Sequence, residues 1–375
     1  GADGMAGGAG DDFYVVDHIG DRVTENAGEG IDTVTSSVSF SLTGHVENLV
    51  LTGAAALTAT GNSLANAIAG NAGVNTINGG GGADAMAGGG GNDIYIVDNV
   101  GDVVTELAGQ GTDLVKSTVT FTLGAEVEKW TRRGSGAIDG TGNAVANTIA
   151  GNEAANRLDG GAGADKLLGA GGNDVYIVDN VADQVIEASS GGGLDRVESS
   201  VSFTLGDHVE ELVLTGAGAI DGTGNAGANS LTGNAAANRL DGGRGNDVLA
   251  GGGGDDSLLG GLGLDTLTGG AGNDRFVFDK AILAANADNI LDFTRGADTI
   301  VLENAQFKGL AAGAMSASAL AIGTSAADAD DRIVYDPATG RLWYDADGSG
   351  ATAQILFATL ASPPATLAAS DFLVV

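Results

Sequence analysis

The sequence predicts an all-β solenoid, and three observations lead to this prediction. A nine-residue unit of the form G-G-x-G-x-D-x-U-x, in which U is a large apolar residue, recurs in phase in several blocks. These blocks lie within a longer repeat of about 81 residues, which places Asp12, Asp93 and Asp174 at equivalent positions. The composition agrees, because a chain of 375 residues with 66 glycines and 5% aromatic residues suits stacked rungs better than one large globular core.

The clearest block spans residues 242–277 and reads GGRGNDVLA, GGGGDDSLL, GGLGLDTLT and GGAGNDRFV. Glycines at positions one, two and four let the backbone turn sharply and bring carbonyl oxygens close to a cation, and the aspartate at position six adds a carboxylate oxygen. Calcium is the ion that suits such hard ligands. The residue at position eight is predicted to point inward from a three-residue strand. A thin apolar core would then form from Leu249, Leu258, Leu267 and Phe276.

This block resembles the RTX, or hemolysin-type, calcium-binding nonapeptide repeats of secreted bacterial proteins. The resemblance implies a right-handed parallel β-roll, in which two units make one coil and calcium ions lie in rows between successive coils. Loops eighteen residues apart would share an ion, so that Asp247 faces Asp265 and Asp256 faces Asp274. The predicted metal sites also include the glycines at positions two and four, which are Gly243, Gly245, Gly252, Gly254, Gly261, Gly263, Gly270 and Gly272.

Two earlier blocks, 61–96 and 142–177, and the opening of a third block at 224 follow the same pattern, with asparagine in place of aspartate in their first two units. Asparagine still offers a carbonyl oxygen, so one interpretation is a set of weaker calcium sites. The other is an asparagine ladder that satisfies backbone groups in the turns. The same spacing pairs Asn66 with Asp84, Asn75 with Asp93, Asn147 with Asp165, Asn156 with Asp174, Asn229 with Asp247, and Asn238 with Asp256.

The first residues of the chain continue the pattern, because Asp3 and Asp12 also occupy position six. Residues 1–6 read as the end of an incomplete unit, from which we expect a longer protein with preceding segments. Between the blocks lie three aligned spacers with alternating apolar and polar residues, which are predicted to be further solenoid rungs. The resulting modules are three RTX repeat modules at 1–96, 97–177 and 178–277, followed by a C-terminal cap and secretion signal at 278–375.

Each spacer keeps an acidic trio, interpreted either as a second class of calcium site or as carboxylates on solvated turns. The trios are Asp17, Glu25 and Asp32; Asp98, Glu106 and Asp113; and Asp179, Glu187 and Asp195.

The second spacer departs from the others at residues 129–133, where Lys-Trp-Thr-Arg-Arg indicates either a partner contact or local drift.

The last hundred residues change character. Residues 290–302 resemble the I-x-D-F-x-x-G-x-D-x-I-x-L segment that caps RTX β-rolls, and residues 342–350 resemble the terminal hairpin of the same proteins. Asp345 and Asp347 in that hairpin could hold an ion, but a β-turn with acidic tips is the favoured interpretation. Residues 371–375, an aspartate followed by apolar residues, resemble a type I secretion signal and imply the type I secretion apparatus as a partner.

The net charge of −33 predicts how the chain folds. Without cations the aspartate rows would repel one another and the glycine-rich chain would lose much entropy on ordering, so we expect folding to depend on extracellular calcium. Several calcium ions per chain are expected. The same charge argues against nucleic acid as a partner. The sequence has no cysteine and no apolar run of eighteen residues, so metal rather than disulfides would stabilise it and no transmembrane segment is expected.

Catalytic signals are weak. His18, His45 and His208 lie in separate spacers, and the sequence has no H-E-x-x-H or G-x-S-x-G motif, so we expect no catalytic residues and no enzyme activity in this chain. The predicted function is a secreted calcium-binding structural or interaction protein that assembles into a surface layer, filament or adhesin through self-assembly or a cell-surface partner. The alternative is the C-terminal calcium-dependent folding and secretion module of a larger secreted protease, lipase or epimerase.

Overall fold

The structure, a computed structural model, describes residues 1–188 and 193–375. In these ranges it contains short β-strands, three 3-10 helices and no α-helix. The chain forms two compact units, residues 1–193 and 194–375. The 3-10 helices are η1 (Ala284–Asn286), η2 (Ala317–Ala319) and η3 (Ala369–Asp371).

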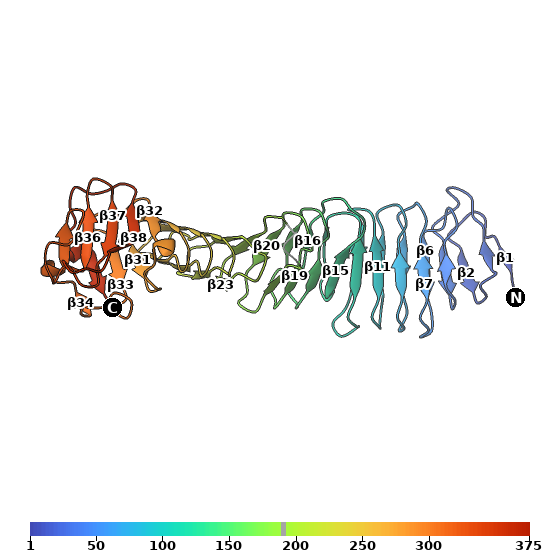
Figure 1. The fold of residues 1–375 in the computed structure, drawn as a ribbon. Coiled ribbons are helices and arrows are strands. Elements are labelled where there is room, and N and C mark those ends of the chain that lie inside the picture. The colour runs from blue at the N-terminus through green and yellow to red at the C-terminus, as the bar shows by residue number, and fades with distance from the viewer. Residues whose placement is uncertain (189–192) are drawn as a thin grey trace. The chain divides into compact units, whose positions relative to one another are not determined.

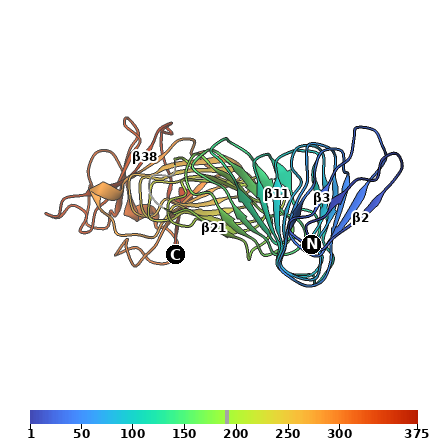
Figure 2. The ribbon, with the colours of Figure 1, turned by 90° about the vertical axis from the view of Figure 1, so that its right-hand side faces the viewer.

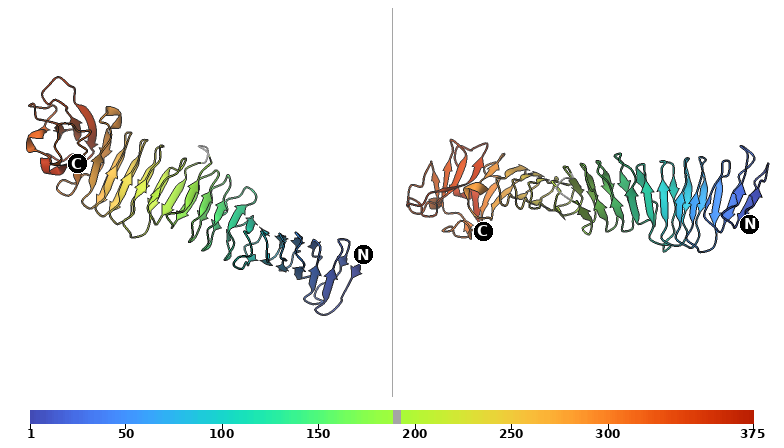
Figure 3. Two further views of the ribbon diagram at one scale, coloured as in Figure 1. Left: turned by 90° about the horizontal axis from the view of Figure 1, so that it is seen from below. Right: turned by 45° about the vertical axis from the view of Figure 1, so that its right-hand side comes forward.

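The first unit is a stack of coils whose strands pair in parallel (Figures 1 and 3). Figure 2 shows its chain winding in loops that stack on one another. One sheet has the order β12 (Val103–Val104), β10 (Ala85–Ala87), β8 (Ala67–Ala69), β6 (Asn48–Leu51), β4 (Thr33–Ser36) and β2 (Phe13–Val16). A second has the order β21 (Gln184–Ile186), β19 (Lys166–Leu168), β17 (Thr148–Ala150), β15 (Lys129–Arg132), β13 (Leu114–Ser117), β11 (Ile94–Val97), β9 (Thr76–Asn78), β7 (Thr58–Thr60) and β5 (Phe40–Ser41). β14 (Phe121–Thr122), β16 (Gly140–Thr141), β18 (Arg157–Asp159) and β20 (Val175–Val178) pair in that order, and β1 (Gly4–Met5) pairs with β3 (Arg22–Val23).

Two nonapeptide units make one coil. From β6 to β11, consecutive strands alternate between the two large sheets. Ala67 of β8 pairs with Ala85 of β10, eighteen residues later in the chain. The nonapeptide length therefore sets the coil length, as the sequence predicts.

The spacers are also solenoid rungs, but their coils differ in length. Ile94 pairs with Leu114, and Leu114 pairs with Lys129. The first of these coils is therefore longer than a nonapeptide coil, and the second is shorter. The 81-residue repeat contains an odd number of strands, so β2 lies in the six-stranded sheet, whereas its equivalent β11 lies in the nine-stranded sheet. Equivalent rungs of the first two repeats therefore belong to opposite sheets.

The core is a narrow apolar column inside the coils. The strands bury every second side chain, as expected for a pleated strand with one face inward. Leu249, Leu258, Leu267 and Phe276, the predicted core residues at position eight, are all 0% exposed. Ile77 and Tyr95 occupy the same position in the first unit and are also fully buried.

The second unit continues the same design and ends in a cap. One sheet has the order β22 (Arg196–Ser199), β24 (Glu211–Leu214), β26 (Ser230–Thr232), β28 (Val248–Gly253), β30 (Thr266–Ala271), β32 (Asp288–Ile290), β38 (Ile355–Leu360), β37 (Arg341–Tyr344), β36 (Ile333–Asp336) and β35 (Leu320–Ile322). The other has the order β23 (Phe203–Thr204), β25 (Gly222–Thr223), β27 (Arg239–Asp241), β29 (Ser257–Leu259), β31 (Arg275–Phe278), β33 (Thr299–Leu302), β39 (Phe372–Val374) and β34 (Gly313–Ala314).

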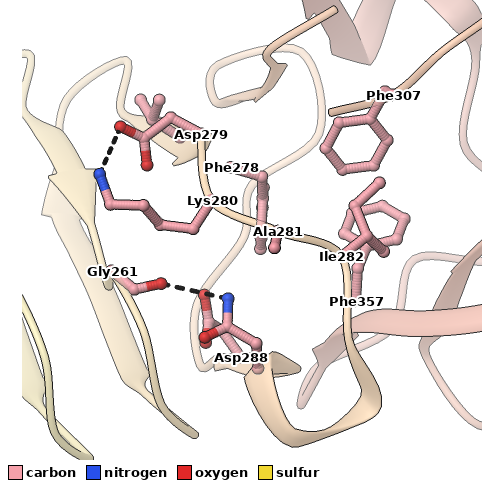
Figure 4. Close-up of a pocket in the computed structure, with 11 residues that line it drawn as sticks. Gly261, Phe278, Asp279, Lys280, Ala281, Ile282, Asp288, Phe307 and Phe357 are labelled. Carbon is pink, nitrogen blue, oxygen red and sulfur yellow. Dashed lines mark hydrogen bonds and ion pairs between the residues drawn. The ribbon is translucent and has the colours of Figure 1, made fainter. Parts of the chain in front are cut away.

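The cap adds antiparallel strand pairs to the parallel ones. β36, β37 and β38 pair antiparallel, which places a hairpin where the sequence predicts one. Phe357 packs edge-on against Phe278 and against Phe307, with ring centroids 5.1 Å apart in each pair (Figure 4). These aromatic contacts form part of the apolar core of the cap. The predicted fold class, an all-β parallel β-roll with a β-rich cap, is confirmed.

Candidate calcium sites

The aspartates at position six lie in the turns that lead into the short strands. Asp247, Asp256, Asp265 and Asp274 are each 1% exposed. The backbone N–H of Asp247 donates to Asp265 Oδ1 at 2.8 Å, and that of Asp256 donates to Asp274 Oδ1 at 2.9 Å. Loops eighteen residues apart are therefore in direct contact, and the two predicted aspartate pairs lie together.

The second oxygen of these carboxylates has no donor. Among the described residues, Oδ2 is buried without a hydrogen-bond partner in Asp84, Asp93, Asp165, Asp247, Asp256, Asp265 and Asp274. A Cβ added at Gly242 would lie 2.5 Å from Asp247 Oδ2 and 2.5 Å from the carbonyl oxygen of Gly260 in the next coil. Side-chain and main-chain oxygens thus converge beside the glycine at position one. Buried anionic oxygens without donors are costly unless a cation neutralises them, so this donor set fits calcium.

The predicted glycines at positions two and four shape these turns. All eight have φ between 93° and 154°, the left-handed region that glycine adopts without strain. A Cβ at Gly261 would also collide with the carbonyl oxygen of Gly243 in the neighbouring coil. These positions therefore require glycine both for their backbone conformation and for the close stacking of the coils.

Burial makes the ionised form of the aspartates unfavourable. Desolvation raises the pKa of Asp247 to about 7, and the neighbouring Asp265 adds to this shift. Desolvation likewise raises the pKa of Asp93, Asp165 and Asp256 to about 6. Hydrogen bonds from the backbone act in the opposite direction but do not cancel the effect.

The six asparagines at position six are held differently. Asn66 Oδ1 accepts a hydrogen bond from the backbone N–H of Asn62 at 2.8 Å, and its Nδ2 donates to the carbonyl of Val46 at 3.1 Å. Both amide atoms are likewise engaged in Asn75, Asn147, Asn156, Asn229 and Asn238. The predicted partners do lie in contact, because each asparagine N–H donates to Oδ1 of the aspartate eighteen residues later, at 2.7–2.8 Å.

Three predicted aspartates have settings of their own. Asp174 is 0% exposed, and its Oδ1 accepts from the N–H of Asn156. Asp12 is half-buried, and its N–H donates to Asp32 Oδ1 at 2.9 Å. The Asp3 side chain is 70% exposed, so it lacks the enclosed setting of the other aspartates.

The position-six aspartates from Asp84 onward thus accept from an N–H group one coil earlier, and this series of contacts, the aspartate ladder, extends into the spacers beyond the predicted pairs. The N–H groups of Asp84 and Asp165 donate to Oδ1 of Asp102 at 3.0 Å and of Asp183 at 2.9 Å. Asp21 accepts in the same way from the N–H of Asp3. Applying the eighteen-residue spacing one coil further would have found all three acceptors.

The ladder also continues into the cap. The N–H of Asp265 donates to Asp288 Oδ1 at 3.2 Å, and the N–H of Asp274 donates to Asp298 Oδ1 at 3.0 Å. Asp288 is 3% exposed, and its burial next to Asp265 raises its pKa (Figure 4). The coils that lead into the cap are longer than the nonapeptide coils, so the nonapeptide spacing does not reveal these partners.

The acidic trios of the spacers need a correction. Asp17, Asp98 and Asp179 are exposed. In all three spacers, the place expected for the first aspartate is taken by the position-six aspartate of the preceding turn. The carboxylates that come together, with one oxygen of each within 4.8 Å of the others, are Asp12, Glu25 and Asp32; Asp93, Glu106 and Asp113; and Asp174, Glu187 and Asp195.

Of the two interpretations of residues 129–133, the position of Trp130 favours local drift in the rung over a partner contact. Trp130 is 1% exposed and points into the coil, where its ring would lie 2.7 Å from a Cβ added at Gly140. The equivalent residues of the other repeats, Leu49 and Leu212, are buried as well. Trp130 is therefore a core residue of its rung.

The histidines of the spacers and the acidic residues of the C-terminal hairpin lie in turns. His45 and His208 have φ of 69° and 67°, and Glu126 occupies the equivalent position with φ of 60°, which indicates a structural turn position. Asp347 Oδ2 accepts from the N–H of Thr352 at 3.1 Å, and its own N–H donates to Asp345 Oδ1 at 3.2 Å. This is the arrangement of an acidic β-turn.

None of the helices in the described ranges could span a membrane.

Parts of the chain are similar to known sequences and structures. The model of the RTX calcium-binding nonapeptide repeat matches four times, at residues 60–95, 141–176, 223–258 and 250–280. The endo-1,3-1,4-beta-glycanase ExsH of Rhizobium meliloti (strain 1021) is 42% identical over 64 residues, which is 17% of this chain and 14% of the glycanase. The extracellular lipase LipA of Serratia marcescens matches in structure with a TM-score of 0.26 and 15% identity, over 71% of this chain and 45% of the lipase chain.

The chain thus spans less than half the length of either similar protein. The four matches cover the blocks in which buried aspartates, glycine turns and eighteen-residue coils occur together. These blocks are therefore RTX calcium-binding nonapeptide repeats.

Proposed function

We propose that this chain is an extracellular β-roll that folds when calcium neutralises its ladder of buried aspartates. The observation that carries the proposal is the set of buried Oδ2 atoms that no donor satisfies in the described coils. Removing a carboxylate from water without a partner costs several kcal/mol, which is comparable to the total stability of many domains. Binding of calcium to the folded chain alone would shift the equilibrium toward folding.

The proposal assigns calcium to the aspartate positions and not to the asparagine positions. Asn66 and its five equivalents use both amide atoms for hydrogen bonds, so they need no ion. In the aspartate coils the corresponding oxygen is negatively charged and without a donor. Extracellular modules of this kind bind calcium at about 10⁻⁴ to 10⁻³ M, so the cytosol would leave the chain unfolded.

Export by a type I apparatus is part of the proposal. In the folded unit, Phe372 and Val374 of the segment that resembles the signal are 3% and 2% exposed. Asp371 Oδ2 accepts from Arg295 Nε at 3.0 Å. Any apparatus that reads this segment would therefore have to do so before the cap folds.

For the biological role we propose a structural or interaction protein whose repeats assemble at the cell surface. The observation that supports this role is the long repeat, which presents equivalent rungs at regular intervals. The second candidate is a folding module within a larger secreted enzyme. It is favoured by the glycanase match, since a related stretch makes up a small share of a protein described as an enzyme.

A calcium titration tests the folding proposal and separates the two roles. Far-UV circular dichroism and light scattering are followed together, with magnesium as the control ion. We expect a cooperative gain of β-structure near millimolar calcium. Growth of particle mass afterwards supports assembly, and a stable monomer supports the enzyme module. A chain that is fully folded in excess chelator would refute calcium-dependent folding.

A further inference from the structure

Each of the three repeats contains a carboxylate cluster that joins one position-six aspartate to two acidic residues of the following spacer. Asp93, Glu106 and Asp113 have oxygens within 4.8 Å of one another and are 1%, 5% and 1% exposed. They come from three successive segments: the turn before β11, the residues after β12 and the turn before β13. The same arrangement is built from Asp12, Glu25 and Asp32 in the first repeat and from Asp174, Glu187 and Asp195 in the third.

The backbone orients these carboxylates toward a common point. One oxygen of Asp113 accepts from the N–H of Asp93 at 2.7 Å, and one oxygen of Glu106 accepts from the N–H of Gly88 at 3.3 Å. The other oxygen of all three carboxylates is buried without a hydrogen-bond partner in the described structure. The first repeat matches, with Asp12 donating to Asp32 and Gly7 donating to Glu25. Three carboxylates are thus fixed with one free oxygen each.

A tyrosine hydroxyl supplies independent support for a ligand. Tyr14 is 6% exposed, and its hydroxyl is buried without a partner among the described residues. A Cβ added at Gly7 would lie 2.5 Å from that hydroxyl and would collide with Asp12 Oδ2. The hydroxyl and the carboxylate oxygen therefore both point to the space beside Gly7. Tyr95 has the same place in the second repeat, and its hydroxyl donates to Glu106. Tyrosine stands here at position eight, where most other units carry an aliphatic residue. An unsatisfied hydroxyl in the core costs stability unless a ligand engages it.

We propose that the tyrosine–carboxylate clusters of the first two repeats are a second kind of calcium site, with three carboxylates and a tyrosine hydroxyl around one ion. All donors are oxygens, which suits calcium rather than zinc or another soft-ligand metal. Three carboxylates give more negative charge than the two aspartates of a ladder position, so the clusters bind calcium more tightly than the ladder. This inference rests on the proposed calcium dependence and shares Asp12 and Asp93 with the position-six aspartates, but it adds the spacer carboxylates Glu25, Asp32, Glu106 and Asp113 as ligands.

The two sites belong to opposite sheets of the first unit. Asp12 and Tyr14 lie at β2 in the six-stranded sheet, whereas Asp93 and Tyr95 lie at β11 in the nine-stranded sheet. The second site joins coils of unequal length, because the coil from β11 to β13 is longer than the coil from β13 to β15. Calcium at these points would pin the irregular spacer rungs to the regular nonapeptide coils.

The test counts tightly bound ions on the whole chain. Calcium is titrated against a chelating competitor for the parent, the E25Q/E106Q variant and a D265N/D274N control. We expect E25Q/E106Q to lose two tightly bound ions and to keep the later transition, and D265N/D274N to show the reverse. Unchanged tight binding in E25Q/E106Q, with the control altered, overturns the second kind of site alone. If D265N/D274N behaves as the parent, the ladder proposal fails instead.

A milder variant protects the test against misfolding. Y14F/Y95F removes only the two hydroxyls and keeps the rings in the core. Terbium replaces calcium, and its emission is excited through tyrosine. The first terbium ions to bind should give less emission in Y14F/Y95F than in the parent. In D265N/D274N, the emission from these first ions should equal that of the parent. Full emission in a folded Y14F/Y95F chain would show that the metal does not lie beside these tyrosines and would overturn the proposal.

Discussion

At the residue scale, the choice between aspartate and asparagine at position six decides what a turn can do. Asn156 Oδ1 accepts from the N–H of Asn152 and its Nδ2 donates to the carbonyl of Ile138, so the turn closes on its own. Asp265 uses one oxygen for the N–H of Asp247 and leaves the other without a donor. The same motif position thus alternates between a self-sufficient turn and an unneutralised carboxylate.

This contrast predicts two different kinds of destabilisation. Asp265→Asn should remove bound calcium and raise the calcium midpoint of folding, because a charged ligand is lost. Asn156→Ala should lower stability by about 1–2 kcal/mol at every calcium concentration, because two hydrogen bonds disappear. Calcium stoichiometry and urea unfolding measure the two effects. Equal calcium dependence of both variants would contradict the assignment.

The glycine at position one is predicted to be required because of space rather than conformation. Gly242→Ala places a Cβ 2.5 Å from Asp247 Oδ2, at the point where the oxygens converge, and should cost about 1–3 kcal/mol in calcium. Gly253→Ala is the matched control, since its nearest neighbour lies 3.7 Å away. Urea unfolding at saturating calcium compares them. A loss as large in the control would show that glycine flexibility, and not the cradle, is responsible.

At the element scale, each rung adjusts its core to its own sequence. The rung of β15 accepts Trp130 because Gly140 in β16 leaves room for the indole. The equivalent positions of the first repeat hold Leu49 and Ala59, both buried. In the second repeat the larger residue is thus matched by a smaller one on the strand it contacts, whereas the third repeat combines Gly222 with Leu212.

A double-mutant cycle should detect this match. Gly140→Ala alone should destabilise the chain, because its Cβ would lie 2.7 Å from the Trp130 ring. In a Trp130→Leu background the same change should be tolerated, with a coupling free energy of about 0.5–3 kcal/mol. Thermal or urea unfolding of the four proteins gives this number. Additive effects would mean that the two side chains do not compete for space.

At the scale of the whole molecule, the excess of acidic residues opposes folding unless it is neutralised. The sequence contains 49 acidic and 16 basic residues. Many of the acidic groups are buried in the turns of both units, where desolvation raises their pKa values. The folded state without calcium therefore takes up protons that the unfolded chain releases.

Protons should thus replace calcium in part. The pKa of Asp247 rises from 3.8 to about 7, and that of Asp93 and Asp256 rises from 3.8 to about 6. A raised pKa in the folded state gives stability that is complete below the unfolded value and is lost as pH rises through the folded value. In chelator, β-structure should accordingly increase as pH falls from about 7 to about 4. Circular dichroism measures it, and a loss of structure on acidification would contradict the prediction.

The sequence alone determined the regular part of this protein. A nonapeptide with glycine turns and an inward residue at position eight closes a coil in two units, so the partners of Asp247 and Asp256 could be predicted by counting. Leu258 and Phe276 could be placed in the core for the same reason. Local periodicity carries this information because each coil contacts only its neighbours.

The tertiary structure decided the contacts that the nonapeptide spacing does not predict. The unequal coils of the second spacer bring Asp93 rather than Asp98 to Glu106, and a longer coil at the cap brings Asp288 to Asp265. An odd number of strands in each repeat places equivalent rungs in opposite sheets. The physical reason is register: which side chains meet across coils depends on the length of each loop, and the alternating pattern of a strand does not encode that length.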